Sequence, residues 1–438
     1  MPLFSFSRKP KETKFQIDDS DRENVIKKVK SVISYLGFPK PGAEQYLFDA
    51  TNFSQTFSSG KISIEHLIAD LTVLYSLSCV QISYELIEDV RDIENMPRGI
   101  QGKAFDSETQ IIDNGYRIFL AKSLEKQPDH LVYCLVNEFA AIRLLETKMF
   151  TDMGGYPQLV YHTAIYFGFG LVLNMNLMES FISSDSMWVR TWKHIPPLSI
   201  ESIAFSLAIY AHLTGNNDPD WGKSLPNELK VLFEKACIYL TNPSVFEYNK
   251  SKLEFNHQIR LAIGQYKRNN FEAALEILRS IEIIELDEKE SLTLYNYLGY
   301  YSTRNCDLEE SISYYRKVIE INLNYQFACD NLGYALIRLG KLDEGKEFVE
   351  MSMRIGNNNN AYSYRNLALY HHKKGNIAEA KENFESAFRE MKDSVDLLEY
   401  HYGDFLLDIG EREKGLEFIK KAVEKGEPEA VFYESEMR

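Results

Sequence analysis

The sequence predicts a mainly α-helical protein, in which a mixed α+β N-terminal domain precedes an array of paired antiparallel helices. Short runs of strand-like alternation lie between residues 80 and 120, and a long apolar helical stripe begins at residue 129. In the C-terminal part a large residue followed by a small one recurs at steps of 34, 35 and 35 residues. These pairs are Leu298-Gly299, Leu332-Gly333, Leu367-Ala368 and Tyr402-Gly403.

The composition fits a globular protein of more than one domain. The 438 residues are 45% hydrophobic and 26% charged, so long disordered stretches are not expected. The formal net charge of -15 disfavours general attraction to nucleic acid or to an anionic membrane. We therefore expect no nucleic-acid partner.

Cysteine usage and the N-terminus indicate the compartment. The five cysteines are widely spaced, odd in number and form no C-x-x-C pair, which is typical of reduced thiols in a cytoplasmic protein. Residues 1–18 carry Arg8, Lys9, Lys11 and Lys14 after an apolar run too short for a signal peptide, so a flexible basic tail is expected. Residues 159–178 are long enough to cross a bilayer but include His162, Asn174 and Asn176, which favours a buried helix over a membrane span.

Residues 19–250 are expected to form the α+β domain. Asp19-Ser20-Asp21 can start an amphipathic helix that stops at Gly37, and a second helix is expected over residues 63–76. Strands are expected at 46–50, 80–87 and 111–120, with irregular chain at 100–105. Further helices are expected over 129–148, 158–178, from residue 200 onward, and 226–240.

Residues 116–148 are expected to form a strand, a loop and then a helix with an acidic residue at its middle. This order resembles the zinc metallopeptidases of the H-E-x-x-H class. In that class two His residues bind zinc and the Glu activates a water molecule. The matching positions here are Asn137, Glu138, Phe139, Ala140 and Ala141, so only the Glu is kept. The resemblance therefore implies a degenerate zincin-like domain without its metal ligands.

The residues of this helix allow two other interpretations. His130, Cys134 and Glu138 lie at i, i+4 and i+8, and His162 could join them as metal ligands. The simpler interpretation is a core cysteine, a surface histidine and a Glu138 bonded to neighbours such as Arg143. We expect no metal and no cofactor, and Glu138 stays a candidate relic of catalysis rather than a catalytic residue.

The recurring pairs are part of a longer pattern. Seven residues after each small residue comes a turn position, and five residues later a second small one. The turn positions are Cys306, Gly340, Gly375 and Gly410, and the second small residues are Ser311, Gly345, Ala380 and Gly415. Together with a weaker copy at Leu261-Ala262, this pattern resembles the tetratricopeptide repeat (TPR) family. It implies five repeats over residues 255–425 in an α-α superhelix, with 426–438 as a C-terminal cap or tail.

The resemblance implies a concave surface that binds another protein or peptide. In the repeat register, basic and amide side chains fall on the first helix of successive repeats, where they could hold an acidic segment or a C-terminal carboxylate. These predicted partner-binding residues are Arg260, Lys267, Asn296, Arg304, Asn331, Arg338, Arg365, Asn366 and Lys373, with Asp408 ending the series. The alternative is that the basic residues merely complement helix dipoles.

The sequence as a whole predicts a cytoplasmic, bacterial, non-catalytic interaction protein, acting as an adaptor or as an inhibitor of the immunity type. A hydrolase with an altered site around Glu138 and a structural assembly subunit are the alternatives. Polar groups converging on Glu138 would favour the hydrolase.

Overall fold

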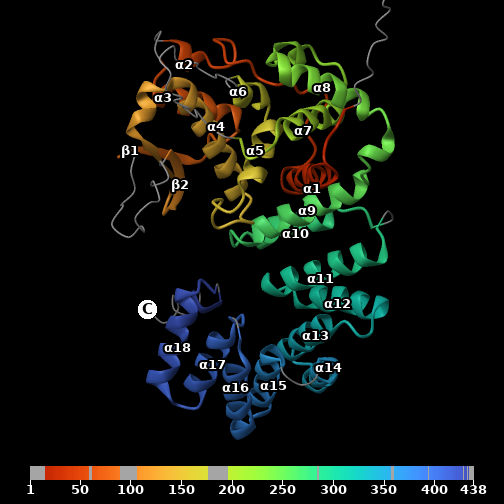
Figure 1. Cartoon of the computed structure of the whole chain (residues 1–438). Coiled ribbons are helices and arrows are strands. Elements are labelled where there is room, and N and C mark those ends of the chain that lie inside the picture. Colours follow the sequence, from red (N-terminus) through yellow and green to blue (C-terminus); the bar gives the residue numbers. More distant parts are fainter. Residues whose placement is uncertain are drawn as a thin grey trace, which may run out of the picture. The chain divides into compact units, whose positions relative to one another are not determined.

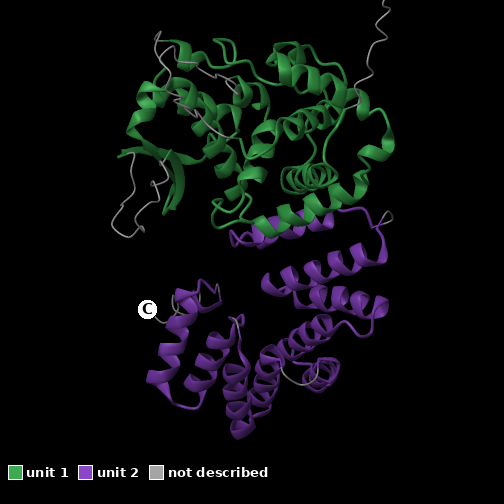
Figure 2. Ribbon diagram, in the orientation of Figure 1, with its two compact units in different colours: residues 1–264 green, residues 265–438 purple. Residues whose placement is uncertain are grey.

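The computed structural model describes residues 15–58, 62–88, 106–175, 196–283, 286–356, 360–392, 394–427, 429–431 and 433. The chain divides into two compact units, residues 1–264 and 265–438 (Figure 2). The division falls inside helix α9 (Lys250–Tyr266). The predicted basic tail lies mostly outside the described residues, as does the predicted irregular segment 100–105.

Unit 1 is mostly helical with one small sheet (Figure 1). Its α-helices before α9 are α1 (Asp19–Leu36), α2 (Ser54–Ser58), α3 (Ile64–Leu74), α4 (Pro128–Leu145), α5 (Pro157–Tyr166), α6 (Gly170–Asn174), α7 (Ile200–Leu213) and α8 (Asn227–Tyr239). Short 3-10 helices are η1 (Lys122–Lys126), η2 (Asp220–Ser224) and η3 (Pro243–Val245). Asp18 caps α1 by accepting a hydrogen bond from the backbone N–H of Ser20, so the predicted start of this helix is confirmed.

The sheet has the order β1-β3-β2, with β1 (Gln81–Ile87) parallel and β2 (Ser107–Ile112) antiparallel to β3 (Gly115–Ala121). The single strand predicted over 111–120 is wrong, because the chain turns between β2 and β3. Asn114-Gly115 is a strong hairpin signal in the sequence, and Gly115 has a φ of 151°. The strand predicted at 46–50 is also wrong, since this segment has no strand structure.

Helix α4 forms the centre of the core of unit 1. It contacts α3, α5, α6 and β2, and most of its side chains are buried. The helix predicted over 158–178 is interrupted, because Gly168 has a φ of 91° and separates α5 from α6. Its carbonyl oxygen accepts a hydrogen bond from the backbone N–H of Tyr46. Among the described helices of the chain, none has the length and apolarity to span a bilayer.

Unit 2 begins with α10 (Phe271–Arg279) and continues as four helix pairs (Figure 1). The first helices are α11 (Glu288–Arg304), α13 (Gln326–Arg338), α15 (Ala361–Lys374) and α17 (Leu398–Asp408). The second helices are α12 (Leu308–Ile321), α14 (Leu342–Ile355), α16 (Ile377–Glu390) and α18 (Arg412–Glu424). Each first helix contacts the next first helix, so these four form a continuous layer, which we call the inner layer.

The repeat pattern has the predicted structural meaning. The four turn residues Cys306, Gly340, Gly375 and Gly410 all have positive φ between 65° and 88°, a conformation that glycine adopts at little cost. Gly333 on α13 faces Gly345 on α14, and a Cβ added to Gly333 would lie 2.7 Å from the Gly345 carbonyl oxygen. The small residues are therefore required for close helix contact.

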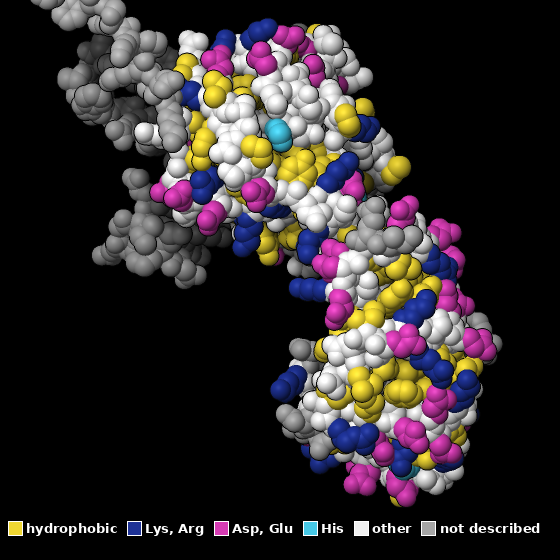
Figure 3. Space-filling model, turned by 90° about the vertical axis from the view of Figure 1, so that its right-hand side faces the viewer, with side chains coloured by type: hydrophobic (Ala, Val, Ile, Leu, Met, Phe, Trp, Pro, Cys, Tyr) yellow, Lys and Arg dark blue, Asp and Glu magenta, His cyan; other side chains and the backbone are white. Residues whose placement is uncertain are grey.

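On the face shown in Figure 3, acidic and basic side chains are interspersed rather than gathered by sign.

Candidate binding site on the inner layer

The inner layer carries one basic side chain at the same position of three successive first helices. These are Arg304 on α11, Arg338 on α13 and Lys373 on α15. The Arg304 side chain is only 8% exposed, and its Nη2 lies 3.4 Å from the Glu429 carboxylate. Burial is the largest single influence and lowers the pKa of Arg304, but the Glu429 carboxylate and the nearby tyrosines together outweigh it, so the pKa is raised.

The two arginines retain donors without acceptors. Among the described residues, Nε and Nη1 of Arg304 and Nη1 of Arg338 have no hydrogen-bond partner. An unsatisfied buried donor costs roughly 1 to 3 kcal/mol, more when it is charged. The inner layer therefore has capacity for further acceptor atoms beside the one carboxylate that it already holds.

Tyrosines surround these arginines. The hydroxyl groups of Tyr266 and Tyr300 are 2.8 Å apart, and Tyr300 donates to the Asp396 carboxylate. The Tyr334 hydroxyl lies 2.9 Å from Nε2 of His401, and the Arg338 guanidinium lies 5.7 Å from the Tyr334 ring centre. Burial raises the pKa of Tyr266 and of Tyr300, so both hydroxyls stay protonated and can donate hydrogen bonds.

Arg365 and Asn366, also predicted as partner-binding residues, bond to their own chain. The Arg365 guanidinium donates to the Asn366 side-chain oxygen at 2.8 Å and 3.0 Å, and to the backbone oxygen of Asp396. It also lies 4.5 Å from the Tyr334 ring centre. Asn366 donates to the backbone oxygen of Asp330. Both side chains are buried and stabilise the inner layer.

The remaining predicted residues are dispersed. Arg260 belongs to unit 1, where its guanidinium lies 4.2 Å from the Tyr35 ring centre. Lys267 and Lys373 are exposed, and Asn331 is half-buried. Asn296 is half-buried as well, and its side-chain oxygen has no donor among the described residues.

The segment after α18, which the sequence predicted only as a cap or tail, contributes acidic groups. Glu429 contacts Arg304, and Glu427 accepts a hydrogen bond of 2.7 Å from the backbone N–H of Leu397. Burial and the neighbouring Glu399 raise the pKa of Glu427 to about 7. Sequence reasoning missed both glutamates. Their signal was two acidic residues directly after an array whose predicted inner face is basic.

Glu138 has a complete set of hydroxyl donors in unit 1. The Ser107 hydroxyl donates to its Oε1 at 2.7 Å and the Thr109 hydroxyl to its Oε2 at 2.6 Å, both from β2. Burial raises its pKa although these hydrogen bonds oppose the shift. The suggested neighbour Arg143 instead lies over the Phe167 ring. Polar groups therefore converge on Glu138, as expected for the hydrolase alternative. In the described part of the chain, however, the side chains that hydrogen-bond to its carboxylate are two hydroxyls, and neither is an imidazole or a thiol.

The alternative metal ligands point to other partners. Nε2 of His130 lies 3.8 Å from Asp106, while His162 is held by the Gln158 backbone oxygen at 2.7 Å and the Ser206 hydroxyl at 3.1 Å. Burial lowers the pKa of His162 to about 4. In the described part of the chain, the group that could hold an ion is His372, Asp404 and Asp408 in unit 2.

Stacked helix pairs with a continuous inner layer place unit 2 in the class of α-α helical-repeat proteins. Within this class, residues 293–325, which include most of α11 and all of α12, match the family described as Tetratricopeptide repeat. Unit 2 therefore contains tetratricopeptide-like repeats, and such repeats generally mediate interactions between proteins.

Three solved structures resemble part of the chain. TTC0263, a thermophilic TPR protein of Thermus thermophilus, shares 16% identity and covers 39% of this chain and 90% of its own, with a TM-score of 0.33. MamA of Desulfovibrio magneticus RS-1 shares 17% sequence identity and covers 40% of this chain and 95% of its own, with a TM-score of 0.30. YrrB, described as a TPR protein with an unusual peptide-binding site, shares 19% sequence identity and covers 41% of this chain and 91% of its own, with a TM-score of 0.26. No curated protein matches the chain.

Proposed function

We propose that this protein is a non-catalytic adaptor or inhibitor that binds an acidic segment or C-terminal carboxylate of a partner protein on the inner layer of unit 2. The observation that carries the proposal is the contact between Arg304 and Glu429, in which the inner layer already holds a carboxylate of its own chain. Arg338 supplies a second guanidinium with an unsatisfied donor beside the same group of tyrosines.

A partner carboxylate would gain charge-assisted hydrogen bonds from these arginines, which are roughly twice as strong as neutral ones. Tyr300, which is half-buried, offers aromatic surface for the rest of the segment, since tyrosine combines apolar area with a polar hydroxyl. Asn296, Asn331 and Lys373 extend the contact along the inner layer, and Lys267, directly after α9, adds an exposed charge outside that layer. Glu429 competes with the partner for Arg304, so binding is strongest when Glu429 is displaced.

For unit 1 we propose a pseudo-peptidase domain with a structural role. The two positions that hold histidines in H-E-x-x-H peptidases are Asn137 and Ala141, and the Asn137 amide donates to the backbone oxygen of Tyr133 on its own helix. A cytoplasmic location is supported by the five cysteines, all of which are free thiols. The bacterial origin expected from the sequence remains a proposal.

The test begins with capture of a partner by the full-length protein, identification of the partner by mass spectrometry, and titration of the purified pair. The combined change Arg304→Glu and Arg338→Glu should weaken binding by several kcal/mol, because charge pairs at interfaces typically contribute about 2 to 5 kcal/mol when truncated. Glu429→Gln should strengthen it by removing the internal competitor.

Matched controls separate this proposal from the alternatives. Arg316→Glu reverses a half-exposed charge on α12 that pairs with Glu344 at 2.7 Å, outside the inner layer, and should leave affinity unchanged. Glu138→Gln should also leave it unchanged, whereas a hydrolase would lose activity. If the double variant keeps full affinity at moderate salt, the partner binds elsewhere and the assembly-subunit alternative gains support.

A further inference from the structure

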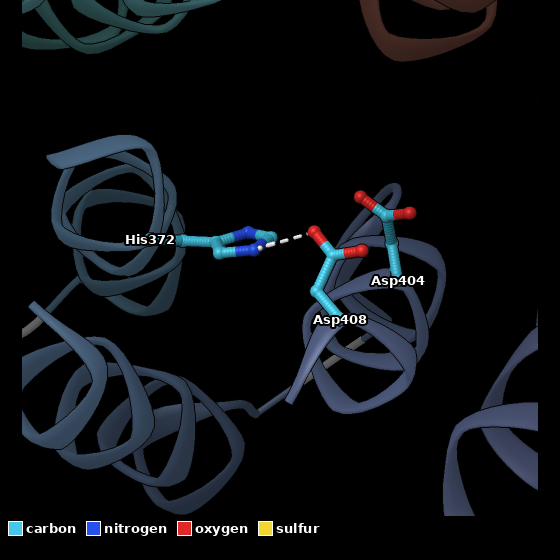
Figure 4. Close-up of side chains that lie close together, drawn as sticks. All are labelled: His372, Asp404 and Asp408. Carbon is cyan, nitrogen blue, oxygen red and sulfur yellow. Dashed lines mark hydrogen bonds and ion pairs between the residues drawn. The ribbon is translucent and has the colours of Figure 1, made fainter. Parts of the chain in front are cut away.

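The basic series on the inner layer ends in an acidic group at its C-terminal end. At the same repeat position, α17 carries Asp408 where the three preceding first helices carry Arg304, Arg338 and Lys373. Asp404 lies one turn earlier on the same helix, and His372 on the last turn of α15 points toward both carboxylates (Figure 4). Nε2 of His372 is 3.0 Å from Oδ2 of Asp408, and one ligand atom from each of the three residues lies within 4.8 Å of the others.

The surroundings of this group leave it short of positive charge. Asp404 is half-buried, and among the described residues no side chain or backbone group donates a hydrogen bond to it. The Asp408 carboxylate repels that of Asp404, while His372 and Lys373 attract it. Like charges one helical turn apart repel each other. A cation between Asp404 and Asp408 would remove this repulsion.

The imidazole ring of His372 is fixed by packing, and one of its two nitrogens has no hydrogen-bond partner in the described part of the chain. The His372 side chain is only 12% exposed, and its ring packs edge-on against Phe405 with centroids 5.2 Å apart. Its Nδ1 is buried without a hydrogen-bond partner in the described part of the chain. Packing therefore restricts how the ring can turn away from the two carboxylates. Such preorganisation lowers the entropy cost of binding an ion.

We propose that His372, Asp404 and Asp408 bind a divalent transition-metal ion, with Zn²⁺ as the preferred species. One imidazole and two carboxylates are donors that zinc accepts, whereas calcium and magnesium prefer all-oxygen sites. Neighbouring ligand atoms of a tetrahedral zinc ion lie roughly 3.3 Å apart, so binding draws the Asp404 carboxylate inward by side-chain rotation. Three protein ligands leave one position for water or for a carboxylate from outside.

The experiment titrates ZnCl₂ into the metal-free full-length protein by isothermal calorimetry, with cobalt absorption in the visible range as a second readout of the ligand set. The parent should bind one ion per chain at this site. His372→Ala, His372→Gln and the pair Asp404→Asn and Asp408→Asn should each weaken binding at least tenfold. Circular dichroism confirms that each variant is folded, and His372→Gln, which keeps a hydrogen-bonding side chain, guards against a packing defect in His372→Ala.

His371→Ala is the matched control, since His371 precedes His372 on α15 and lies beside Asn376. It should keep the parent's zinc affinity and cobalt spectrum. The proposal is overturned if the parent binds no zinc, if both His372 variants bind as tightly as the parent, or if calcium and magnesium bind as tightly as zinc. Because the probe is the metal alone, these outcomes do not depend on the proposed partner binding.

Discussion

Two acidic residues with little exposure, Glu138 and Glu429, differ in how their charge is compensated. Each carboxylate oxygen of Glu138 accepts a hydrogen bond from a hydroxyl group on β2, so neither oxygen lacks a donor. Glu429 has an ion pair with Arg304, but both of its oxygens and two nitrogens of the arginine lack hydrogen-bond partners among the described residues. Groups with unmet hydrogen bonds are the ones that gain most from a ligand, which favours the inner layer over Glu138 as the binding site.

His162 should make unit 1 sensitive to acid. Its pKa is about 4 in the folded protein and about 6.5 when unfolded, so between these values the unfolded chain binds more protons. The free energy of unfolding should therefore fall by about 3 kcal/mol as the pH drops from 6.5 to 4. Urea unfolding across this range should show a flatter pH profile for His162→Gln than for the parent. His212→Gln, at a more exposed site on α7, should keep the parent's profile.

The Glu427 carboxyl group should give the stability of unit 2 the opposite pH dependence. Its folded pKa of about 7 lies above the usual 4.5, so the folded state binds more protons and loses stability as the pH rises from 4.5 to 7. Glu427→Gln keeps an oxygen for the backbone N–H of Leu397 and removes the buried charge. The variant should be more stable than the parent at pH 8, by at most about 3 kcal/mol, and nearly equal at pH 5. An equal difference at both pH values would contradict the assigned cause.

The helix pair α13–α14 shows why small residues recur. Gly333 and Gly345 bring the two backbones together, and Val349 is fully buried in the same contact. In the pair α15–α16 the corresponding residues are Ala368 and Ala380, and both are also fully buried. The repeat thus tolerates a methyl group in one pair but not in the other.

Replacement of Gly333 by Ala should destabilise unit 2 although alanine is the better helix former by about 1 kcal/mol. The new Cβ would lie 2.5 Å from Val349 Cγ2 and 2.7 Å from the Gly345 oxygen, so the two helices must move apart. The expected net loss is roughly 1 to 3 kcal/mol in thermal or urea unfolding. Alanine at the exposed Glu347 of α14 is the control and should change stability little. A more stable Gly333→Ala variant would contradict the close contact.

At the scale of the whole molecule, the position of α9 decides where the chain can be divided. The sequence places the domain boundary near residue 250, whereas α9 contributes to unit 1 up to Gly264. The His257 ring lies close to Gly37, and Arg260 lies over Tyr35. Asn249 caps the helix by accepting a hydrogen bond of 2.9 Å from the backbone N–H of Lys252.

A fragment of residues 1–268 should therefore unfold cooperatively, while a fragment of residues 1–249 should lose several kcal/mol because the contacts of α9 with α1 are missing. Buried side chains typically contribute about 2 to 5 kcal/mol each when truncated. Circular dichroism during urea unfolding of the two fragments gives the comparison. Equal stability would move the boundary back to the position expected from the sequence.

The sequence by itself determined the helix-pair repeats of unit 2 from α11 to α18, while the first helix of the fifth repeat expected from residue 255, α9, lies mostly in unit 1. Helix pairs, left-handed turns at Gly340, Gly375 and Gly410, and small residues at helix contacts all follow from spacings within about 35 residues, because each repeat depends mainly on itself and its neighbours. In unit 1 the same reasoning found α1 and α4. It missed the β2–β3 turn, although Asn114-Gly115 signals it locally, and the break at Gly168.

Only the tertiary structure decided which side chains meet. The contacts of Tyr300 with Asp396, Arg304 with Glu429 and His372 with Asp408 join residues separated by 36 to 125 positions. Their geometry depends on small rotations accumulated from one repeat to the next, which no local pattern encodes. Residue spacing therefore predicted a basic series on the inner layer. It could not predict that a glutamate of the same chain pairs with one member of that series, or that the series ends beside a histidine and two aspartates.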